Sequence, residues 1–596
     1  MTQTQHSPLD IFVIGGGING VGIANDAAGR GLAVSLCEQG DLGGATSSAS
    51  SKLIHGGLRY LEHREFRLVA EALKEREILL RKAPHIIWPL RFILPHRSHL
   101  RPAWMIRAGL FLYDHLGKRN QLPGSHGIRF SPQSPLKPEI MRGFEYSDCW
   151  VDDARLVVLN ALQAREAGAE VLVRTRCTAA RVKNGLWQVE LEDLNSGERL
   201  TRQARTLVNA AGPWVEQVLR DQAAQPSRYS IRMIQGSHLI VPRLNPDERA
   251  YILQNDDRRI VFVLPYEDDF SLIGTTDKQY QGNPAEVSIS DAETDYLLNV
   301  VNAHFQRQLS RQDVVSSFAG VRPLCDDEST DPSAMTRDYT LDLTHAGAPL
   351  LSVFGGKITT YRRLAEAALK QLAFALPHMG PDWTASAQLP GGDIDNQTSF
   401  AERLQQDFPW LSPAQTQRYA RSYGTLCLQF LAGAQSDEAL GEDFGAGLTA
   451  AEVDYLMSHE WAMSVGDIAW RRTKLGLRLT PCQLERLEAS TTAKKAIVMN
   501  LKTDTHETVG MSAADHLKTL MVYAPNLQVD IILADPDVVS DKHDFAEAAH
   551  RLGAEVHYAK VHSAHNVSVH DPLRLANAFQ DMFDTFSTDT LIPPAQ

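Results

Sequence analysis

Several basic residues stand in apolar or glycine-rich stretches, where a solvated charge is unusual. Arg59 lies in HGGLRYL, Arg322 in FAGVRPL, Lys357 in VFGGKIT, and Arg337 in MTRDYT, where Asp338 is an adjacent partner. A buried cation is costly unless an anion meets it, so a structural ion pair explains each one equally well alone. Together they predict a pocket for a small dianion, because the planar fork of arginine matches phosphate oxygens.

One histidine stands in a similar setting. His238 lies in the apolar run IQGSHLIV. In such a strand it is a candidate general base or a hydrogen-bond partner for a substrate hydroxyl. A satisfied core histidine is the alternative, and the local sequence does not decide between them.

A glycine motif near the N-terminus predicts a dinucleotide site. The apolar run 10–14 leads into GGGING, where Gly15, Gly17 and Gly20 match G-x-G-x-x-G, and a second apolar run ends at Glu38. The three glycines allow a tight turn, a close approach to a pyrophosphate and close helix packing, and the helix N-terminus faces the phosphates. Glu38 is placed to accept hydrogen bonds from ribose hydroxyls, which disfavours NADP. The lack of a second such motif disfavours an enzyme that binds both FAD and NADH, and the long stretch after the second strand favours FAD over NAD.

The elements that must position these residues are spread along the chain. The stretch 43–60 (GGATSSASSKLIHGGLRY) predicts a loop along a flavin and its pyrophosphate, with a surface linker as the alternative. The runs 206–212 and 349–354 read as buried strands, and the second enters a glycine turn and a helix. The sequence therefore predicts a cofactor domain in three segments with a substrate domain inserted between them.

Composition sets wider limits. The chain has 596 residues, 43% hydrophobic and 22% charged, with a net charge of −13. That length exceeds a single core, and the acidic balance disfavours nucleic acid as a partner. The six cysteines form no C-x-x-C pair, which predicts reduced thiols in the cytoplasm and no metal site built on them. No signal peptide or membrane-spanning run is seen.

The sequence resembles the FAD-dependent, aerobic respiratory sn-glycerol-3-phosphate dehydrogenases from about residue 8 to about residue 490. The resemblance is carried by IFVIGGGINGVGIANDAAGRGL, ATSSASSKLIHGGLRYLEH, LRPAWMIRAGLFLYDHLGKR, RGFEYSDCWVDDARLV, LVNAAGPWV, GTTDKQY, AGVRPLCDDES and SVFGGKITTYRRLAE. It implies oxidation of sn-glycerol 3-phosphate to dihydroxyacetone phosphate, with electrons passed through FAD to a membrane quinone.

The resemblance also implies a domain plan in the α/β class, similar to D-amino-acid oxidase. A Rossmann-like FAD-binding domain (about 8–85, 150–225 and 335–394) would interleave with a mixed α+β substrate domain (about 86–149 and 226–334). A C-terminal helical domain would span 395–490, followed by an extra α/β tail over 491–596.

Site residues follow from the same resemblance. The FAD site would comprise Gly15, Gly17, Gly20, Glu38, Thr46, Ser47, Ser48, Gly212, Gly356, Lys357 and Thr359. The substrate site would comprise Arg59, Tyr60, His238, Arg259, Arg322, Arg337, Lys357 and Thr360. Among these, His238, Lys357 and Arg322 are expected to be catalytic, and whether His238 or Lys357 is the base stays open.

The stretch 86–119 predicts contact with a membrane surface. It carries six basic residues against one acidic residue, Asp114, interleaved with aromatic residues such as Trp88 and Trp104. This composition is typical of a segment lying in the plane of an anionic interface. It predicts a peripheral protein at the inner face of the plasma membrane, with inter-domain packing as the alternative.

The tail, residues 491–596, lies outside the resemblance to the glycerol-3-phosphate dehydrogenases. Residues from about 494 to 596 resemble a fragment of the 2-phospho-lactate transferase / gluconeogenesis-factor family, without the glycine-rich phosphate loop of that family. A complete second active site is therefore not expected. His506, His516 and Asp515 read as solvated residues rather than metal ligands. Two other hypotheses for the function of the whole chain remain. One is an FAD-dependent oxidase that uses O2 on another small anion, and the other is a non-catalytic nucleotide-binding regulator. A homodimer is left open.

Overall fold

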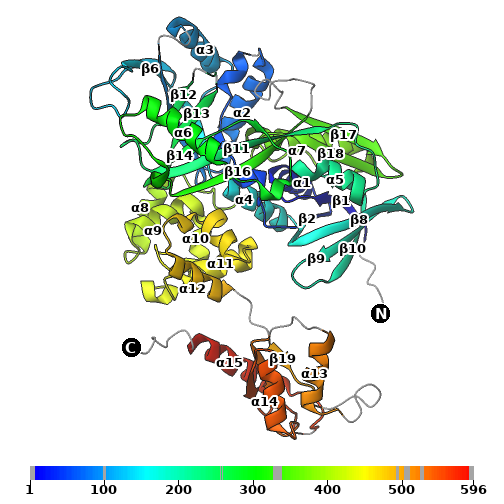
Figure 1. Cartoon of the computed structure of the whole chain (residues 1–596). Helices are drawn as coiled ribbons and strands as arrows, with labels where there is room; N and C mark the ends of the chain where they lie inside the picture. Colours follow the sequence, from blue (N-terminus) through cyan, green and yellow to red (C-terminus); the bar gives the residue numbers. More distant parts are fainter. Residues whose placement is uncertain are drawn as a thin grey trace. The chain divides into compact units, whose positions relative to one another are not determined.

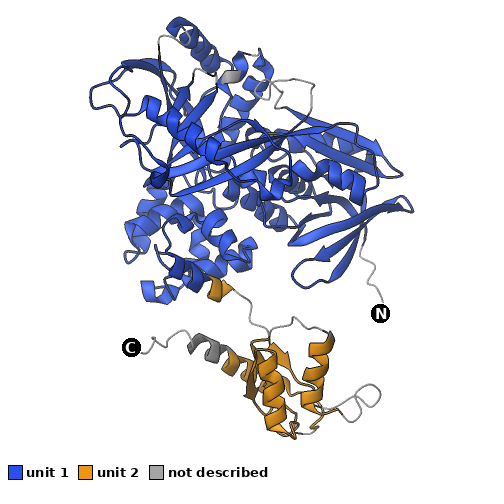
Figure 2. Ribbon diagram, in the orientation of Figure 1, with its two compact units in different colours: residues 1–487 blue, residues 488–596 orange. Residues whose placement is uncertain are grey.

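The computed structural model describes two compact units, residues 1–487 and residues 488–596 (Figure 2). The described residues are 7–62, 64–97, 102–255, 257, 259–325, 338–491, 496–501, 511–523, 529–564 and 566–588. Of the described helices, none combines the length and the apolar character needed to cross a membrane.

The first sheet of unit 1 carries the glycine turn. Its parallel strands β18, β10, β1, β2 and β7 lie in that order, with β17 at one edge. Strand β9 pairs antiparallel with β10, and β8 pairs antiparallel with β9. The bounds are β1 Leu9–Ile14, β2 Val34–Glu38, β7 Glu170–Val173, β8 Thr175–Lys183, β9 Leu186–Asp193, β10 Arg199–Asn209, β17 Tyr339–His345 and β18 Pro349–Gly355. The four apolar runs named from the sequence are thus neighbouring strands.

Three helices cover this sheet. They are α1 (Ile18–Gly29), α4 (Asp153–Glu166) and α7 (Tyr361–Leu372), with α1 packed against both of the others (Figure 1). Small residues let α1 approach closely, since a Cβ at Gly22 would lie 2.8 Å from the Tyr361 ring. This packing brings the start of α1 beside the end of β18.

A second, mostly antiparallel sheet of ten strands lies in the same unit, in the order β15-β11-β14-β13-β12-β4-β6-β3, with β16 beside β11 and β5 beside β6. The bounds are β3 Leu53–Ile54, β4 Ile87–Pro95, β5 His126–Arg129, β6 Arg142–Val151, β11 Ile231–Pro242, β12 Ala250–Gln254, β13 Ile260–Tyr266, β14 Phe270–Gly274, β15 Lys278–Gln279 and β16 Ser316–Cys325. Helices α2 (Phe66–Lys82), α3 (Ala103–His115) and α6 (Asp291–His304) accompany it.

The C-terminal part of unit 1 is helical, with α8 Gln397–Asp407, α9 Pro413–Ser422, α10 Cys427–Leu431, α11 Ala450–Glu460 and α12 Pro481–Thr491, which ends past the unit boundary. Buried ion pairs join it to the cofactor domain. Arg155 on α4 pairs with Glu460 on α11, both side chains fully buried, with Nη2 2.8 Å from Oε1. Arg472 pairs with Asp41 after β2, at 2.6 Å.

Unit 2 contains a three-stranded parallel sheet in the order β19 (Ala496–Val498), β20 (Ile531–Ala534) and β21 (Glu555–Tyr558). Its described helices are α13 (Ala513–Tyr523), α14 (Lys542–Arg551) and α15 (Pro572–Thr588), so the tail is an α/β unit with apolar clusters on both sheet faces. Asp515 binds the Ser512 N–H at the start of α13, while His506 lies outside the described residues. Asp535, Asp537 and His562 lie close together, but Asp535 is taken up by loop N–H groups and His562.

The Arg155–Glu460 pair gives a stability prediction. Glu460→Gln leaves the guanidinium buried without a counter-charge, which costs about 3–5 kcal/mol for a broken buried pair. Calorimetric unfolding of the whole chain should show a lower transition temperature for unit 1. The control is Glu192→Gln at the half-exposed Arg176–Glu192 pair, which should leave the transition unchanged. Equal transitions for both variants would show that the buried pair does not join the domains.

Candidate functional site

The turn between β1 and α1 is shaped by close backbone approach. Gly15 has φ +112°, and a Cβ there would lie 2.6 Å from the Ala210 carbonyl oxygen. A Cβ at Gly20 would lie 1.9 Å from the Gly15 carbonyl oxygen. Gly17 caps α1 without a side-chain hydrogen bond, so the helix presents backbone N–H groups at a wall of the cavity. This is the geometry that a pyrophosphate requires.

Glu38 stands at the end of β2 and lines the same cavity. Its carboxylate accepts from the N–H groups of Gly16 and Gly40, each at 2.7 Å. Burial raises the pKa of Glu38, while these two N–H groups oppose the shift. The carboxylate is therefore fixed beside the glycine turn, where a ribose of an adenosine would lie.

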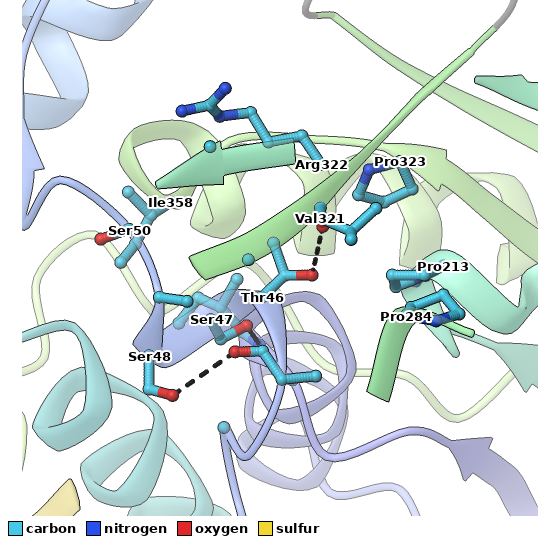
Figure 3. Close-up of a pocket in the computed structure, with 18 of the residues that line it drawn as sticks. Thr46, Ser47, Ser48, Ser50, Pro213, Pro284, Val321, Arg322, Pro323 and Ile358 are labelled. Carbon is cyan, nitrogen blue, oxygen red and sulfur yellow. Dashed lines mark hydrogen bonds between the residues drawn. The ribbon is translucent and has the colours of Figure 1, made fainter. Parts of the chain in front are cut away.

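The loop after β2 runs along the cavity wall. Thr46, Ser47 and Ser48 line it, and the Ser47 hydroxyl accepts from the Ile18 N–H of the glycine turn at 3.0 Å. The Thr46 hydroxyl donates to the Val321 carbonyl on β16 at 2.6 Å, as Figure 3 shows. The loop thus touches both sheets.

The end of β18 forms another wall. Gly356, Lys357 and Thr359 line the cavity, as does Gly212 at the end of β10. Gly356 has φ +106°, and a Cβ there would lie 2.9 Å from the Asn19 side chain. Lys357 Nζ lies 3.9 Å from the centre of the Tyr60 ring, which also lines the cavity. Thr360 is buried and is not among the lining residues.

Arg322 projects from β16 into the cavity (Figure 3). Its guanidinium donates to Asp277 at 2.7 Å and to the Thr275 hydroxyl at 2.9 Å. It lies over Gly236, where a Cβ would be 2.4 Å from Nη2. The Asp277 carboxylate therefore partly compensates the positive charge of Arg322, which the sequence suggested would be uncompensated. The contacts to Asp277 and Thr275 also fix the orientation of the guanidinium.

His238 differs most from the expectation of direct substrate contact. It is 1% exposed and does not line the cavity. Its ring stacks on Phe318 with centroids 4.8 Å apart, and Nε2 lies 3.0 Å from the Ser51 hydroxyl. Burial lowers its pKa well below the usual range, helped by the positive charges of Arg322 and Lys52. The imidazole is therefore neutral at neutral pH.

The structure does not place the three other arginines predicted for substrate binding at the cavity. Arg259 does not line the cavity. It pairs with Asp257 at 2.7 Å and lies over the Tyr296 ring at 4.0 Å, so the structure does not bring it to the other cations. Arg337 and the side chain of Arg59 lie outside the described part of the chain.

Sequence reasoning missed four residues that shape the site. Ser51, Lys52, Thr275 and Asp277 all line the cavity. Lys52 is 4% exposed, and its Nζ donates to Asp153 at 2.7 Å and to the Ser48 carbonyl at 3.1 Å. The sequence feature that could have indicated Lys52 is a lysine at the end of the serine-rich run SSASSK. Its partner Asp153, however, is about a hundred residues away in the chain.

The cavity has a volume of about 1800 Å³. That exceeds the roughly 300–1,000 Å³ of a typical small-molecule pocket, and it has room for a dinucleotide beside a small substrate.

Comparison with known proteins agrees with this geometry. A family model described as FAD dependent oxidoreductase matches residues 10–362, which is more than half of the chain, and one described as the C-terminal domain of alpha-glycerophosphate oxidase matches residues 383–493. The chain belongs to the FAD dependent oxidoreductase family. FAD is therefore its cofactor, and the residues of the glycine turn, Glu38 and the Thr46–Ser48 loop fit it.

Individual relatives narrow the family. A glycerol-3-phosphate dehydrogenase of Pseudomonas aeruginosa is 63% identical over 81% of this chain and 96% of its own length. A D-erythritol 1-phosphate dehydrogenase of Brucella abortus is 53% identical over 81% of this chain and 97% of its own length. The structure of a Bacillus halodurans glycerol-3-phosphate dehydrogenase complexed with FAD has a TM-score of 0.65 and 27% identity, over 82% of this chain and 90% of that one.

These matches confirm the predicted family, fold class and cofactor, and the chain is an enzyme of the FAD-dependent glycerol-3-phosphate dehydrogenase type. The reading as a non-catalytic regulator is accordingly not favoured. Residues beyond 493 lie outside both family models.

The glycine turn gives the second prediction. Gly20→Ala places a methyl group against the Gly15 carbonyl, so the turn must open, and the purified protein should lose its yellow colour. The flavin-to-protein ratio, measured by absorbance after denaturation, should fall from near one to near zero. Gly127→Ala is the control, because its Cβ would meet no atom within 4 Å. Full flavin content in Gly20→Ala would contradict the assignment of this turn.

Proposed function

We propose that the enzyme oxidises sn-glycerol 3-phosphate to dihydroxyacetone phosphate. The observation that carries the proposal is the convergence of Arg322 and Lys357 on the cavity that contains the glycine turn. Bound FAD supplies an acceptor for the hydride that leaves the substrate carbon. The chain's own residues must bind the phosphate, orient C2 and accept the proton of the C2 hydroxyl.

Phosphate binding falls to the two cations. The guanidinium of Arg322, held by Asp277 and Thr275, has a planar set of five donors suited to phosphate oxygens. Lys357 adds a point charge above the Tyr60 ring. Because the phosphate is remote from the reacting carbon, its binding energy serves to position C2. A single amino-acid carboxylate would make less use of two cations, which disfavours an oxidase acting on amino acids.

The substrate proposal gives the third prediction. Under argon, sn-glycerol 3-phosphate should bleach the flavin absorbance of the purified enzyme, whereas glycerol should not. In Arg322→Ala, the substrate concentration needed for half-maximal bleaching, and the KM in turnover, should rise about tenfold or more. The reason is that a lost hydrogen bond to a charged group costs about 1.5–3 kcal/mol. Arg311→Ala, at an exposed pair with Asp295, is the control.

Two outcomes would contradict this proposal. Bleaching by D-erythritol 1-phosphate alone would assign the enzyme to the longer polyol phosphate. An unchanged KM in Arg322→Ala would show that the phosphate binds elsewhere.

We also propose that electrons leave for a membrane quinone, with the enzyme bound peripherally at the inner face of the plasma membrane. Helix α3 supports this. Its buried side holds Ile106, Leu110 and Tyr113, yet Trp104 is 71% exposed and Phe111 57% exposed on the outer side. Large exposed apolar side chains next to basic residues such as Arg107 and Lys118 are typical of a helix lying in a lipid interface.

The membrane proposal gives the fourth prediction. The double variant Trp104→Ser/Phe111→Ser should sediment less with vesicles containing anionic lipid and should reduce quinone embedded in them more slowly. Its anaerobic flavin bleaching should stay at the wild-type rate, because Trp104 and Phe111 are exposed and do not line the cavity. Phe374→Ser removes an exposed aromatic residue elsewhere and is the control. Wild-type binding by the double variant would contradict the role of α3, and faster oxidation by O2 than by quinone would favour the oxidase.

A further inference from the structure

The Ser51–His238 contact lies at the edge of the cavity. Ser51 lines the cavity, whereas His238 does not, and the two meet through Oγ and Nε2 at 3.0 Å. His238 is nevertheless on the cavity-facing side of β11, because Gly236 and Ile240, two residues away on either side, both line the cavity. The serine hydroxyl therefore stands between the imidazole and the space where a substrate binds.

The imidazole is held in one place. Gly274 faces it on β14, where a Cβ would lie 2.1 Å from the ring, and Phe318 stacks against it from β16. Its Nδ1 is buried and has no hydrogen-bond partner among the described residues. Among the described residues, the polar contact of the ring is thus the one to Ser51. A core histidine with a structural role would normally have its ring nitrogens satisfied by backbone or side chains.

Ser51 is held just as firmly, although it belongs to a loop. Its neighbour Ser50 donates through its hydroxyl to Asp153 at 2.7 Å, and its other neighbour, Lys52, pairs with the same carboxylate. Lys52 adopts φ +56°, a conformation that costs free energy and persists where contacts hold it. The backbone on both sides of Ser51 is therefore fixed, and its hydroxyl has a set position.

The pair lies next to the anion site. Arg322 stacks over Gly236, two residues before His238 on the same face of β11, which is a spacing of about 7 Å along a strand. In sn-glycerol 3-phosphate the reacting C2 is joined to the phosphate through only C3 and one oxygen. A phosphate at Arg322 would therefore keep the C2 hydroxyl close to the anion site, beside which the Ser51–His238 pair lies.

We propose that Ser51 is a catalytic residue that contacts the C2 hydroxyl, and that His238 is a positioning residue that acts on the substrate only through Ser51. The inference rests on the proposed function. The C2 hydroxyl gives its proton to Ser51 Oγ as the Ser51 hydroxyl gives its own to His238 Nε2. The C2–H bond breaks with its electron pair leaving as hydride for the flavin, the C2=O double bond forms, and the substrate is oxidised while FAD is reduced.

The charges around the pair make this transfer depend on the substrate, because without it they oppose the charged imidazolium. The neutral imidazole has a lone pair available for a proton, because burial and the cations Arg322 and Lys52 disfavour its charged form. A dianion bound at Arg322 offsets that repulsion at the moment when the proton arrives. The pair is thus best able to accept a proton when the substrate is present.

The fifth prediction concerns flavin reduction in the holoenzyme, followed under argon by stopped flow with sn-glycerol 3-phosphate and, separately, D-erythritol 1-phosphate. Ser51→Ala should lower the limiting rate of reduction about 10²-fold or more, the usual size of a general-base contribution, with little change in the substrate Kd. Ser51→Thr retains a hydroxyl and should restore most of the rate. His238→Gln should be as slow as Ser51→Ala, and the double variant no slower than either, because the two act as a unit.

The control is Ser227→Ala, an exposed serine that does not line the cavity, which should reduce at the wild-type rate. Flavin content and absorbance spectrum show that each variant is folded, and if His238→Gln fails to fold, the Ser51 variants decide alone. A wild-type rate in Ser51→Ala, or an alanine effect that threonine does not repair, overturns the proposal. If only D-erythritol 1-phosphate reduces the wild type, the proposed substrate fails and Ser51 is judged with that compound. If neither reduces it, both proposals fall.

Discussion

The buried ion pair between Lys52 and Asp153 is the interaction on which the geometry of the cavity depends. Asp153 is fully buried at the start of α4. Its carboxylate accepts from Lys52 Nζ, from the N–H and the hydroxyl of Ser50, and from the Ala154 N–H. The Lys52 ammonium also lies 5.3 Å from the Phe318 ring centre. Breaking such a pair leaves a charge uncompensated, so the two residues hold the loop between the sheets in one arrangement.

That loop connects the wall of the cavity that faces the cofactor with the wall that faces the substrate. At one end, Ser47 accepts from the first N–H of α1, the helix whose N-terminus would face the pyrophosphate. At the other end, Ser51 meets His238 on the second sheet, while Thr46 binds the backbone of β16 one residue before Arg322. A shift of the loop would therefore move the cofactor wall and the substrate wall together. Misplacement of reacting groups by even about 1 Å is costly in rate, which gives this coupling a functional meaning.

The parts of the site that the sequence could predict are those with local causes. Gly15, Gly20 and Glu38 lie within one strand–turn–helix–strand unit, so their spacing alone carries the geometry. Ser51 and Lys52 could not be recognised in the same way, because their roles come from His238 and Asp153, which other parts of the chain supply. The same reason explains Arg259: its neighbour Asp257 and the Tyr296 ring hold it outside the cavity. For His238, the strand was readable from the sequence, but its cover by Phe318 depends on strand register.

The arrangement of charges also bears on which polyol phosphate is accepted. In the proposed binding mode, Arg322 and Lys357 would contact only the anionic end of the substrate, and contacts made equally with each candidate give affinity without discrimination. Choice between a three-carbon and a four-carbon chain must therefore come from the walls beyond the reacting carbon. Phe262, Phe318 and Ile252, on three strands of the second sheet, give the cavity apolar surface of this kind. A longer polyol would bring an additional hydroxyl against these side chains, and an unpaired hydroxyl loses hydrogen bonds that water had supplied. This cost favours the shorter glycerol backbone, since its only free hydroxyl besides the reacting one is at C1.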